Sequence, residues 1–220
     1  ETMKTRLIGD IHGKFRSYLS ILPAAGPSIQ IGDYGFGFDH RWDEGAQEWQ
    51  IHNRQHRFIR GNHDSLQVCK RMDGFIQDGI VENDVMFIGG AWSIDRDGRV
   101  EGHSWWADEE LSYPELDRLI DVVEMVHPRI MITHDCPETV AREMFIKPRG
   151  WTQYKTRTGA AFEEMFQRWK PECWVFGHWH HNMDVILDGT RFVCLNELAY
   201  MDIDLDNHTG DERIIPWVRF

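Results

Sequence analysis

Pairs of histidine and aspartate residues two positions apart are the feature of this sequence best suited to chemistry. Asp10 and His12 flank one residue in GDIHG, and His178 and His180 flank one residue in GHWH (177–180). In extended backbone, side chains two positions apart project to the same side, so each pair can close on a single ion. Carboxylates and imidazoles bind divalent metals, and imidazole also transfers protons near neutral pH. The two pairs therefore predict metal binding.

Three further polar blocks follow apolar segments of the chain. Each block has an ordinary explanation when it is taken alone, because glycine followed by polar residues is also typical of a turn. Apart from His63 and Asp64, the blocks supply two Asp, one Asn and four His, which is the inventory of a site for two metal ions. The glycines in them allow sharp turns and close approach of a ligand. In chain order the five blocks are GDIHG (9–13), GD (32–33), GNHD (61–64), TH (133–134) and GHWH (177–180).

Short apolar segments precede these blocks, and helical patterns alternate with them. Such alternation predicts an α/β fold, in which the loops that follow the strands gather at one edge. We expect strands at 5–10, 28–33, 57–64, 129–135 and 173–177, helices at 14–22, 43–56, 65–72, 114–126 and 158–169, and hairpins at 79–92 and 183–196, the second turning at Asp188 and Gly189.

Length and composition favour one α/β domain over residues 3–220. The chain has 220 residues, of which 41% are hydrophobic, and no apolar run approaches the roughly 20 residues of a membrane span. A net charge of -12 disfavours binding to extended nucleic acid, which depends on cationic side chains. Glu1 and Thr2 precede Met3, and we expect them to be a cloning remnant.

The cysteines and the beginning of the chain indicate a cytoplasmic protein. The first apolar stretch leads directly into acidic and histidine residues, unlike a secretory signal. The cysteines form no CxxC pair, which fits reduced thiols better than disulfides or a zinc knuckle. They are Cys69, Cys136, Cys173 and Cys194.

In order and wording, the five blocks resemble the calcineurin-like metallophosphoesterases, whose pattern is D-x-H, G-D, G-N-H-[DE], H and G-H-x-H. The resemblance spans residues 9–180. It implies an αββα sandwich of two facing mixed β-sheets flanked by helices, with two metal ions at the strand ends. It also implies ligand roles for Asp10, His12 and His180 on one ion, for Asn62, His134 and His178 on the other, and for Asp33 on both.

The same resemblance implies hydrolysis of a phosphoester by a hydroxide that bridges the two ions. His63 would contact the phosphate and protonate the leaving oxygen, a role that suits an imidazole. We expect manganese, although mixed nitrogen and oxygen ligands also suit Fe, Zn, Co or Ni. His181 is expected to be exposed or to lie behind the ligands.

The second block departs from the protein Ser/Thr phosphatase branch of the family. That branch has GDxxDRG, whereas this chain has GDYGFGF, so Phe36 replaces the aspartate that orients the catalytic histidine. Gly37 stands where that branch has a phosphate-binding arginine. These differences favour a phosphodiesterase over a protein phosphatase, and they leave Asp64 or Asp39 as candidates to orient His63.

An insertion at 93–113 could cover the metals as a lid. Its aromatic residues Trp105 and Trp106 could stack on a nucleobase, and Arg96 or Arg99 could bind phosphate. The structural alternative is that these tryptophans pack on the core.

The predicted substrate is a small phosphoester or a nucleotide, with a diester favoured over a monoester. A nuclease remains an alternative, because a short single-stranded end could still enter the site. A non-catalytic scaffold with the same fold is the alternative of another class, although all seven ligand positions are filled here. The sequence predicts no membrane association and does not indicate an oligomeric state.

Overall fold

The strands of the computed structural model, which describes residues 3–150, 154–207 and 212–217, form two sheets. The first sheet has four strands in the order β10-β1-β2-β3. The pairs β1–β2 and β2–β3 are parallel, and β10 runs antiparallel to β1. The strands are β1 (Thr5–Ile8), β2 (Ser28–Ile31), β3 (His56–Ile59) and β10 (Tyr200–Ile203).

The second sheet has six strands in the order β4-β5-β6-β7-β9-β8. Its four inner strands are parallel, and β4 and β8 run antiparallel to their neighbours at the two edges. The turn between β8 and β9 contains Asp188 and Gly189, both at positive φ, as a tight hairpin requires. The strands are β4 (Val81–Glu82), β5 (Val85–Ile88), β6 (Ile130–Thr133), β7 (Cys173–Phe176), β8 (Met183–Leu187) and β9 (Thr190–Cys194).

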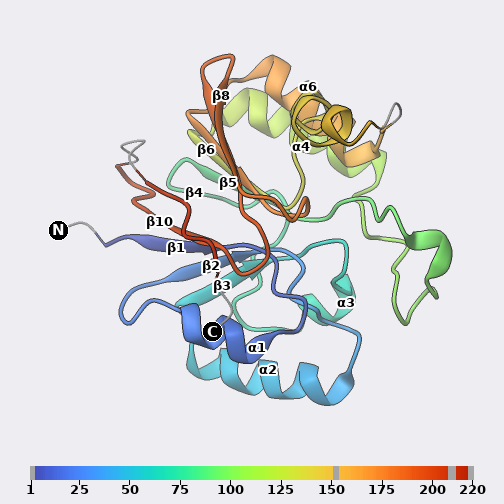
Figure 1. The fold of residues 1–220 in the computed structure, drawn as a ribbon, viewed down its shortest axis with the longest axis vertical. Coiled ribbons are helices and arrows are strands. Elements are labelled where there is room, and N and C mark those ends of the chain that lie inside the picture. Colours follow the sequence, from blue (N-terminus) through green and yellow to red (C-terminus); the bar gives the residue numbers. More distant parts are fainter. Residues whose placement is uncertain (1–2, 151–153, 208–211, 218–220) are drawn as a thin grey trace.

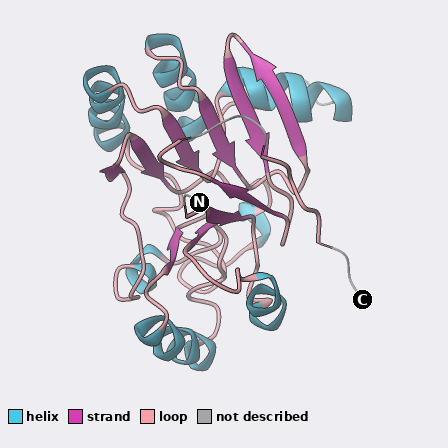
Figure 2. Ribbon diagram, turned by 90° about the vertical axis from the view of Figure 1, so that its left-hand side faces the viewer, coloured by secondary structure: helices cyan, strands magenta, loops and turns pink. Residues whose placement is uncertain are grey.

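Helices cover the outer face of each sheet, so the layers run helix, sheet, sheet, helix (Figures 1 and 2). The four-stranded sheet carries α1 (Phe15–Ile21), α2 (His40–His52) and α3 (Leu66–Cys69), and the six-stranded sheet carries α4 (Tyr113–Val126), α5 (Glu138–Ala141) and α6 (Arg157–Arg168). A π-helical turn (Arg142–Ile146) and a 3₁₀ turn (Lys147–Arg149) follow α5. Among the described residues, no helix is both long and apolar enough to cross a membrane.

The hydrophobic core between the sheets is built by alternate residues of their strands. Leu7 and Ile31 of the first sheet pack in one cluster with Phe87, Ile132 and Val175 of the second, and all are at most 1% exposed. Burial of each such side chain contributes roughly 1.5–3 kcal/mol. This core holds the two sheets face to face and thereby fixes the positions of their strand ends relative to each other.

The observed architecture confirms the predicted α/β sandwich of two mixed sheets. Two segments were missed: α5 with the π-helical turn after it, and β10, a short strand held in place by its antiparallel pairing with β1. Another was displaced: α2 begins at His40, since Asp39 caps it by accepting hydrogen bonds from the N–H groups of Arg41 and Trp42.

The insertion (93–113) extends away from both sheets at the right of Figure 1. Its regular structure is limited to a 3₁₀ turn at Arg96–Gly98 and an isolated bridge between Glu101 and Trp105. Ser93 at its start is 2% exposed, and Glu109 near its end is 3% exposed. The insertion is therefore a loop whose base, rather than its tip, belongs to the core.

Candidate metal centre

The five sequence blocks meet at one edge between the two sheets. Asp10, Asp33 and Asn62 follow β1, β2 and β3 of the four-stranded sheet, and His134 and His178 follow β6 and β7 of the six-stranded sheet. Because neighbouring strands within each set run parallel, their carboxyl ends point to the same edge. The fold therefore gathers these distant residues in one place.

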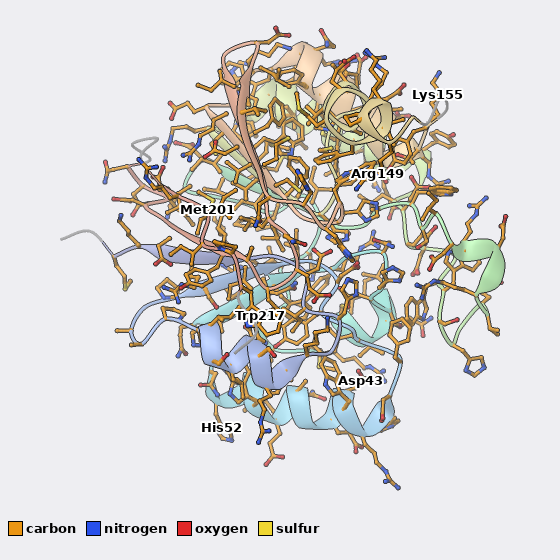
Figure 3. The ribbon with its side chains drawn as sticks, in the orientation of Figure 1. Asp43, His52, Arg149, Lys155, Met201 and Trp217 are labelled. Atoms are coloured by element: carbon orange, nitrogen blue, oxygen red, sulfur yellow. The ribbon has the colours of Figure 1, made fainter. Side chains whose placement is uncertain are left out.

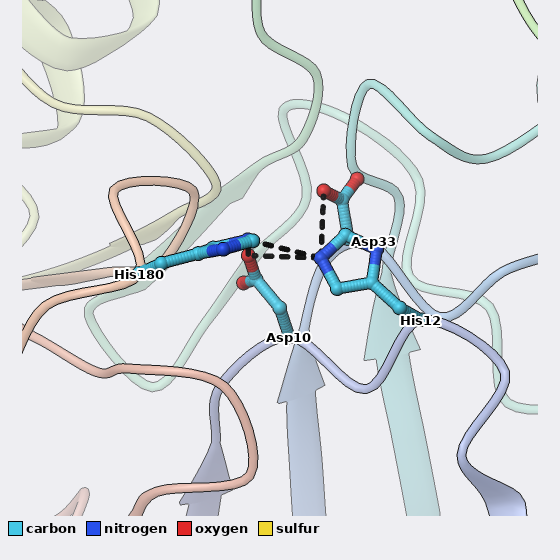
Figure 4. A group of neighbouring side chains, drawn as sticks. All are labelled: Asp10, His12, Asp33 and His180. Carbon is cyan, nitrogen blue, oxygen red and sulfur yellow. Dashed lines mark hydrogen bonds and ion pairs between the residues drawn. The ribbon is translucent and has the colours of Figure 1, made fainter.

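The first group of potential ligands consists of Asp10, His12, Asp33 and His180 (Figure 4). The Nε2 atoms of His12 and His180 lie 3.0 Å apart, and Nε2 of His180 lies 3.1 Å from Oδ2 of Asp10. Two ligand nitrogens at about 2.1 Å from a metal and at right angles would be about 3.0 Å apart. The spacing suits one ion, whereas the exposed His181 lies outside the group.

The second group combines Asp33 with His134 and His178. Nε2 of His134 lies 3.3 Å from Oδ1 of Asp33. The amide oxygen of Asn62 lies 3.0 Å from Nε2 of His134 and 3.0 Å from Nδ1 of His178. Oδ2 of Asp33 faces His12 of the first group at 3.8 Å. Asp33 thus directs one oxygen to each group.

The arrangement of atoms in these groups fits cations. Oδ2 of Asp10 is buried and faces Nε2 of His180 at 3.1 Å. Nδ1 of His134 lies 2.9 Å from the carbonyl oxygen of Ile31 and therefore carries the proton of the neutral ring. The lone pair on its Nε2 then faces the oxygens of Asp33 and Asn62. Lone pairs that converge in this way require a proton or a metal ion between them.

The protonation behaviour of the groups indicates the same need for positive charge. Burial alone would raise the pKa of Asp33, but His134, His63 and His12 hold it well below its usual value. Burial also opposes the protonation of His134, yet Asp33 and Asp10 raise its pKa to about 10. A buried site that binds a proton this tightly in the metal-free protein is suited to a divalent cation.

The backbone that carries these residues is held in an uncommon conformation. His12, Asp33, His178 and His180 have φ values of 44°, 58°, 66° and 49°. Such values are disfavoured for residues other than glycine and cluster at functional sites. A Cβ on Gly61 would lie 2.0 Å from Oδ1 of Asp33, so this position requires glycine. Backbone strain and close packing together direct the side chains inward.

Asp64 joins the loop after β2 to the loop after β3. Its carboxylate accepts hydrogen bonds from the backbone N–H groups of Tyr34, Gly35, Phe36 and Gly61 at 2.7–3.0 Å. Phe36 is fully buried and stacks on Tyr34 with ring centroids 4.5 Å apart. Asp64 therefore organises the loops of the site, and Phe36 belongs to the core.

Both carboxylates that the sequence offered for orienting His63 have other partners. Asp64 binds the backbone N–H groups described above, and Asp39 caps α2. A third carboxylate, Asp95, lines the same cavity as His63. Arg99 lowers the pKa of Asp95, and the charge of His63 adds a smaller effect. Sequence reasoning missed Asp95, because the insertion contains no motif that marks it.

A cavity of about 840 Å³ opens over both groups of ligands. It extends between the layers, from Trp42 on α2 to Arg149 on the far side, which Figure 3 places with the six-stranded sheet. Much of its wall is aromatic, and no motif in the sequence marked Trp42, Trp92 or Tyr154. The aromatic residues that line it are Phe38, Trp42, Trp92, Tyr154 and Trp179.

Of the substrate contacts predicted in the insertion, Arg99 is part of the cavity wall within the described chain, and Trp105, Trp106 and Arg96 are not. The guanidinium of Arg99 is already paired with Asp95 at 2.7 Å. Trp106 makes an edge contact with Phe38, and Arg96 lies over the ring of Trp92. Trp106 and Arg96 therefore contact residues of the cavity wall without being part of that wall.

Comparison with known proteins agrees with this geometry. The model of the calcineurin-like phosphoesterase family matches residues 3–182. No curated protein matches the chain at a significant level.

Solved structures similar to the chain include a Staphylococcus aureus protein assigned as a 5′-nucleotidase, in complex with α-ketoglutarate, with a TM-score of 0.57 and 11% identity. The match covers 100% of this chain and 55% of that one, so the chain spans about half of its length. A dimetal phosphatase from Danio rerio has a TM-score of 0.49 and 11% identity, with 99% of each chain covered. The phosphopantetheinyl hydrolase of Mycobacterium tuberculosis has a TM-score of 0.45 and 15% identity, with 89% and 90% covered.

Proposed function

The chain belongs to the calcineurin-like phosphoesterase family, and from this premise we propose that it is a two-metal phosphodiesterase that acts on a small, nucleotide-like phosphodiester. The position of Asp33 carries the proposal, since its two oxygens face two separate groups of ligands. A shared carboxylate is what two cations close together require. The proposed ligands are Asp10, His12 and His180 for one ion, Asn62, His134 and His178 for the other, and Asp33 for both.

Two divalent ions bound there would supply a nucleophilic water near neutral pH and would offset the negative charge of the phosphoryl group. The protein's own residues would hold the ions and supply the proton for the leaving oxygen. His63 lines the cavity beside the first group, with its ring 5.5 Å from that of His12, and its backbone N–H donates to Asp33. In this position His63 can protonate the leaving oxygen as the phosphoester bond breaks.

The shape and lining of the cavity favour a small substrate with a planar group. Aromatic rings such as Trp92 and Tyr154 can stack on a nucleobase and contribute about 1–3 kcal/mol for each base. Phe36 is buried in the core, and a Cβ on Gly37 would lie 2.5 Å from Cβ of Ser65. The protein phosphatase arrangement therefore has no counterpart at these two positions.

The same proposal includes one domain over residues 3–220, with the insertion as the cover of the cavity. Ser93 and Ile94 at its start, together with Asp95 and Arg99, line the cavity. We also propose manganese as the metal and a reducing, cytoplasmic compartment, since all four cysteines are free thiols.

Hydrolysis of bis-p-nitrophenyl phosphate and of p-nitrophenyl phosphate tests the proposal. Chelator-stripped protein is supplied with Mn²⁺, and Asp33→Asn and His63→Ala are compared with wild type. We expect diester preference, loss of both activities in Asp33→Asn, and a reduction of about 10²–10⁴-fold in His63→Ala with its metal content intact. Preference for the monoester would indicate a phosphatase, and metal-free wild type with full activity would refute the mechanism.

The remaining alternatives predict different results in the same experiment. A nuclease would hydrolyse oligonucleotides with a strong salt dependence. A scaffold would bind two ions and hydrolyse neither ester.

A further inference from the structure

We propose that Ser93 and Glu109, at the two ends of the insertion, are positioning residues that orient the amide of Asn62 toward the metal centre. The inference rests on the proposed function, in which the oxygen of Asn62 binds one ion. Nδ2 of Asn62 donates to Oγ of Ser93 at 2.9 Å, and Oγ of Ser93 donates to Oε2 of Glu109 at 2.5 Å. The backbone N–H of Ser93 donates to Oε1 of Glu109 at 3.2 Å.

This chain of hydrogen bonds determines which atom of the amide faces the metal centre. Oγ of Ser93 donates to Glu109, so the hydroxyl proton of Ser93 points to that carboxylate. The lone pairs of Ser93 must then accept from Asn62, and the amide NH₂ group is the part of Asn62 that can donate. The amide oxygen is left facing His134 and His178, at 3.0 Å from each. An inverted amide would present NH₂ to a cation and could not bind it.

The relay of hydrogen bonds runs from Asn62 through Ser93 to Glu109. Arg60, the residue after β3, joins Glu109 back to the segment that carries Asn62 and so closes the relay into a circuit. The guanidinium of the fully buried Arg60 donates to the carbonyl oxygens of Asp108 and Glu109 at 2.9 and 3.1 Å. Arg60 precedes Asn62 by two residues, so both ends of the circuit belong to the same strand end. Its Nε also donates to Asp78 at 3.0 Å. The position of Glu109 is thus fixed by the same backbone that carries the metal ligand.

Burial makes this circuit sensitive to the loss of any member. Asn62 is 1%, Ser93 2% and Glu109 3% exposed, so a polar group left without its partner there is costly. Residues that support a metal ligand in this way typically change metal affinity by 10–100-fold when they are replaced. The base of the insertion consequently belongs to the metal site, although no residue of the insertion binds the ion.

Mn²⁺ binding by the full-length chain tests the relay, measured by equilibrium dialysis with metal analysis. We expect wild type to bind two ions, and Ser93→Ala and Glu109→Gln each to bind one of them about 10–100-fold more weakly. Glu109→Gln keeps one oxygen for the N–H of Ser93 but places an NH₂ group opposite its hydroxyl. The double variant should lose no more affinity than Ser93→Ala alone, because both changes break the same relay.

The neighbouring Glu110 provides a matched control. It accepts hydrogen bonds from the backbone N–H and the hydroxyl of Thr158 at 2.8 and 3.0 Å, both on Oε1 and on the side of α6. A glutamine can keep its amide oxygen at that position, so Glu110→Gln should bind both ions with wild-type affinity. Ser104→Ala, within the same insertion, should leave both ions bound.

Three results would overturn the inference. Ser93→Ala and Glu109→Gln could both bind two ions with wild-type affinity, the double variant could show additive losses, or Glu110→Gln could lose the same ion as Glu109→Gln. If wild type itself binds fewer than two ions, the proposed function fails and the relay fails with it. Melting curves of the metal-free proteins identify a variant that has lost its fold, and Ser93→Ala, which removes one oxygen, then supplies the test.

Discussion

Replacement of Asp64 by asparagine tests whether the loops of the metal centre depend on one buried carboxylate. Oδ1 of Asp64 accepts from the N–H groups of Gly35 and Phe36, and Oδ2 accepts from those of Tyr34 and Gly61. Asparagine keeps one oxygen. Whichever way its amide lies, two backbone N–H groups then face an NH₂ group and remain unpaired in the core.

The expected cost follows from these two lost hydrogen bonds. A hydrogen bond to a charged group contributes about 1.5–3 kcal/mol, so two of them amount to roughly 3–6 kcal/mol. Burial and the nearby charge of Asp33 raise the pKa of Asp64, although its backbone hydrogen bonds oppose this. Removal of the buried charge of Asp64 therefore offsets part of the lost stability. We expect Asp64→Asn to lower the free energy of unfolding by about 2–4 kcal/mol.

Urea denaturation of the metal-free proteins measures this loss, with Asp43→Asn as the matched control. Asp43 is a half-buried carboxylate in the following segment that accepts one backbone hydrogen bond, from Gly37 at 3.1 Å. Its replacement should cost less than about 1 kcal/mol. Equal losses in the two variants would refute the reasoning, because they would show that the backbone N–H groups around Asp64 find other partners.

Three further predictions concern the site itself. Gly61→Ala should displace Asp33, which a Cβ would approach to 2.0 Å, and should weaken Mn²⁺ binding in dialysis, whereas Gly45→Ala, with open space around its Cβ, should not. Trp92→Ala should raise the KM for a nucleoside cyclic phosphate about 5- to 100-fold, as the loss of one stacking contact implies, and an unchanged KM would remove Trp92 from the substrate site. A chelator should lower Tm, because bound cations offset the repulsion between Asp10 and Asp33. Re-addition of Mn²⁺ at about 100 times its Kd should restore about 2.7 kcal/mol, and a Tm that ignores the metal would contradict cation binding.

The core of the site was predictable because its residues lie in short local blocks. A ligand such as Asp10 or His178 follows a buried strand and a glycine, and that pattern is readable without tertiary contacts. Parallel strands then bring their carboxyl ends together. The structure places every predicted ligand in or beside one of the two groups.

The surroundings of the site were not predictable to the same extent. Trp92, Trp105 and Trp106 are the same residue type. Of these three, Trp92 alone lies in the cavity wall, and the path of the chain decides this. The partners of Asp64 and Asp39 are backbone N–H groups, which leave no trace in the pattern of side chains. Strand β10 was missed for a related reason, since its pairing with β1 joins residues almost 200 positions apart, such as Arg6 and Asp202 with a separation of 196.

The sequence by itself determined the family resemblance, the α/β sandwich and the set of side chains proposed as metal ligands, because residue type and spacing are local properties of five short segments. The tertiary structure decided how these side chains are used. It directs the two oxygens of Asp33 to separate groups and joins Asn62 to Glu109 through Ser93. Such arrangements depend on distances between remote parts of the chain, and these distances are set only when the two sheets pack against each other.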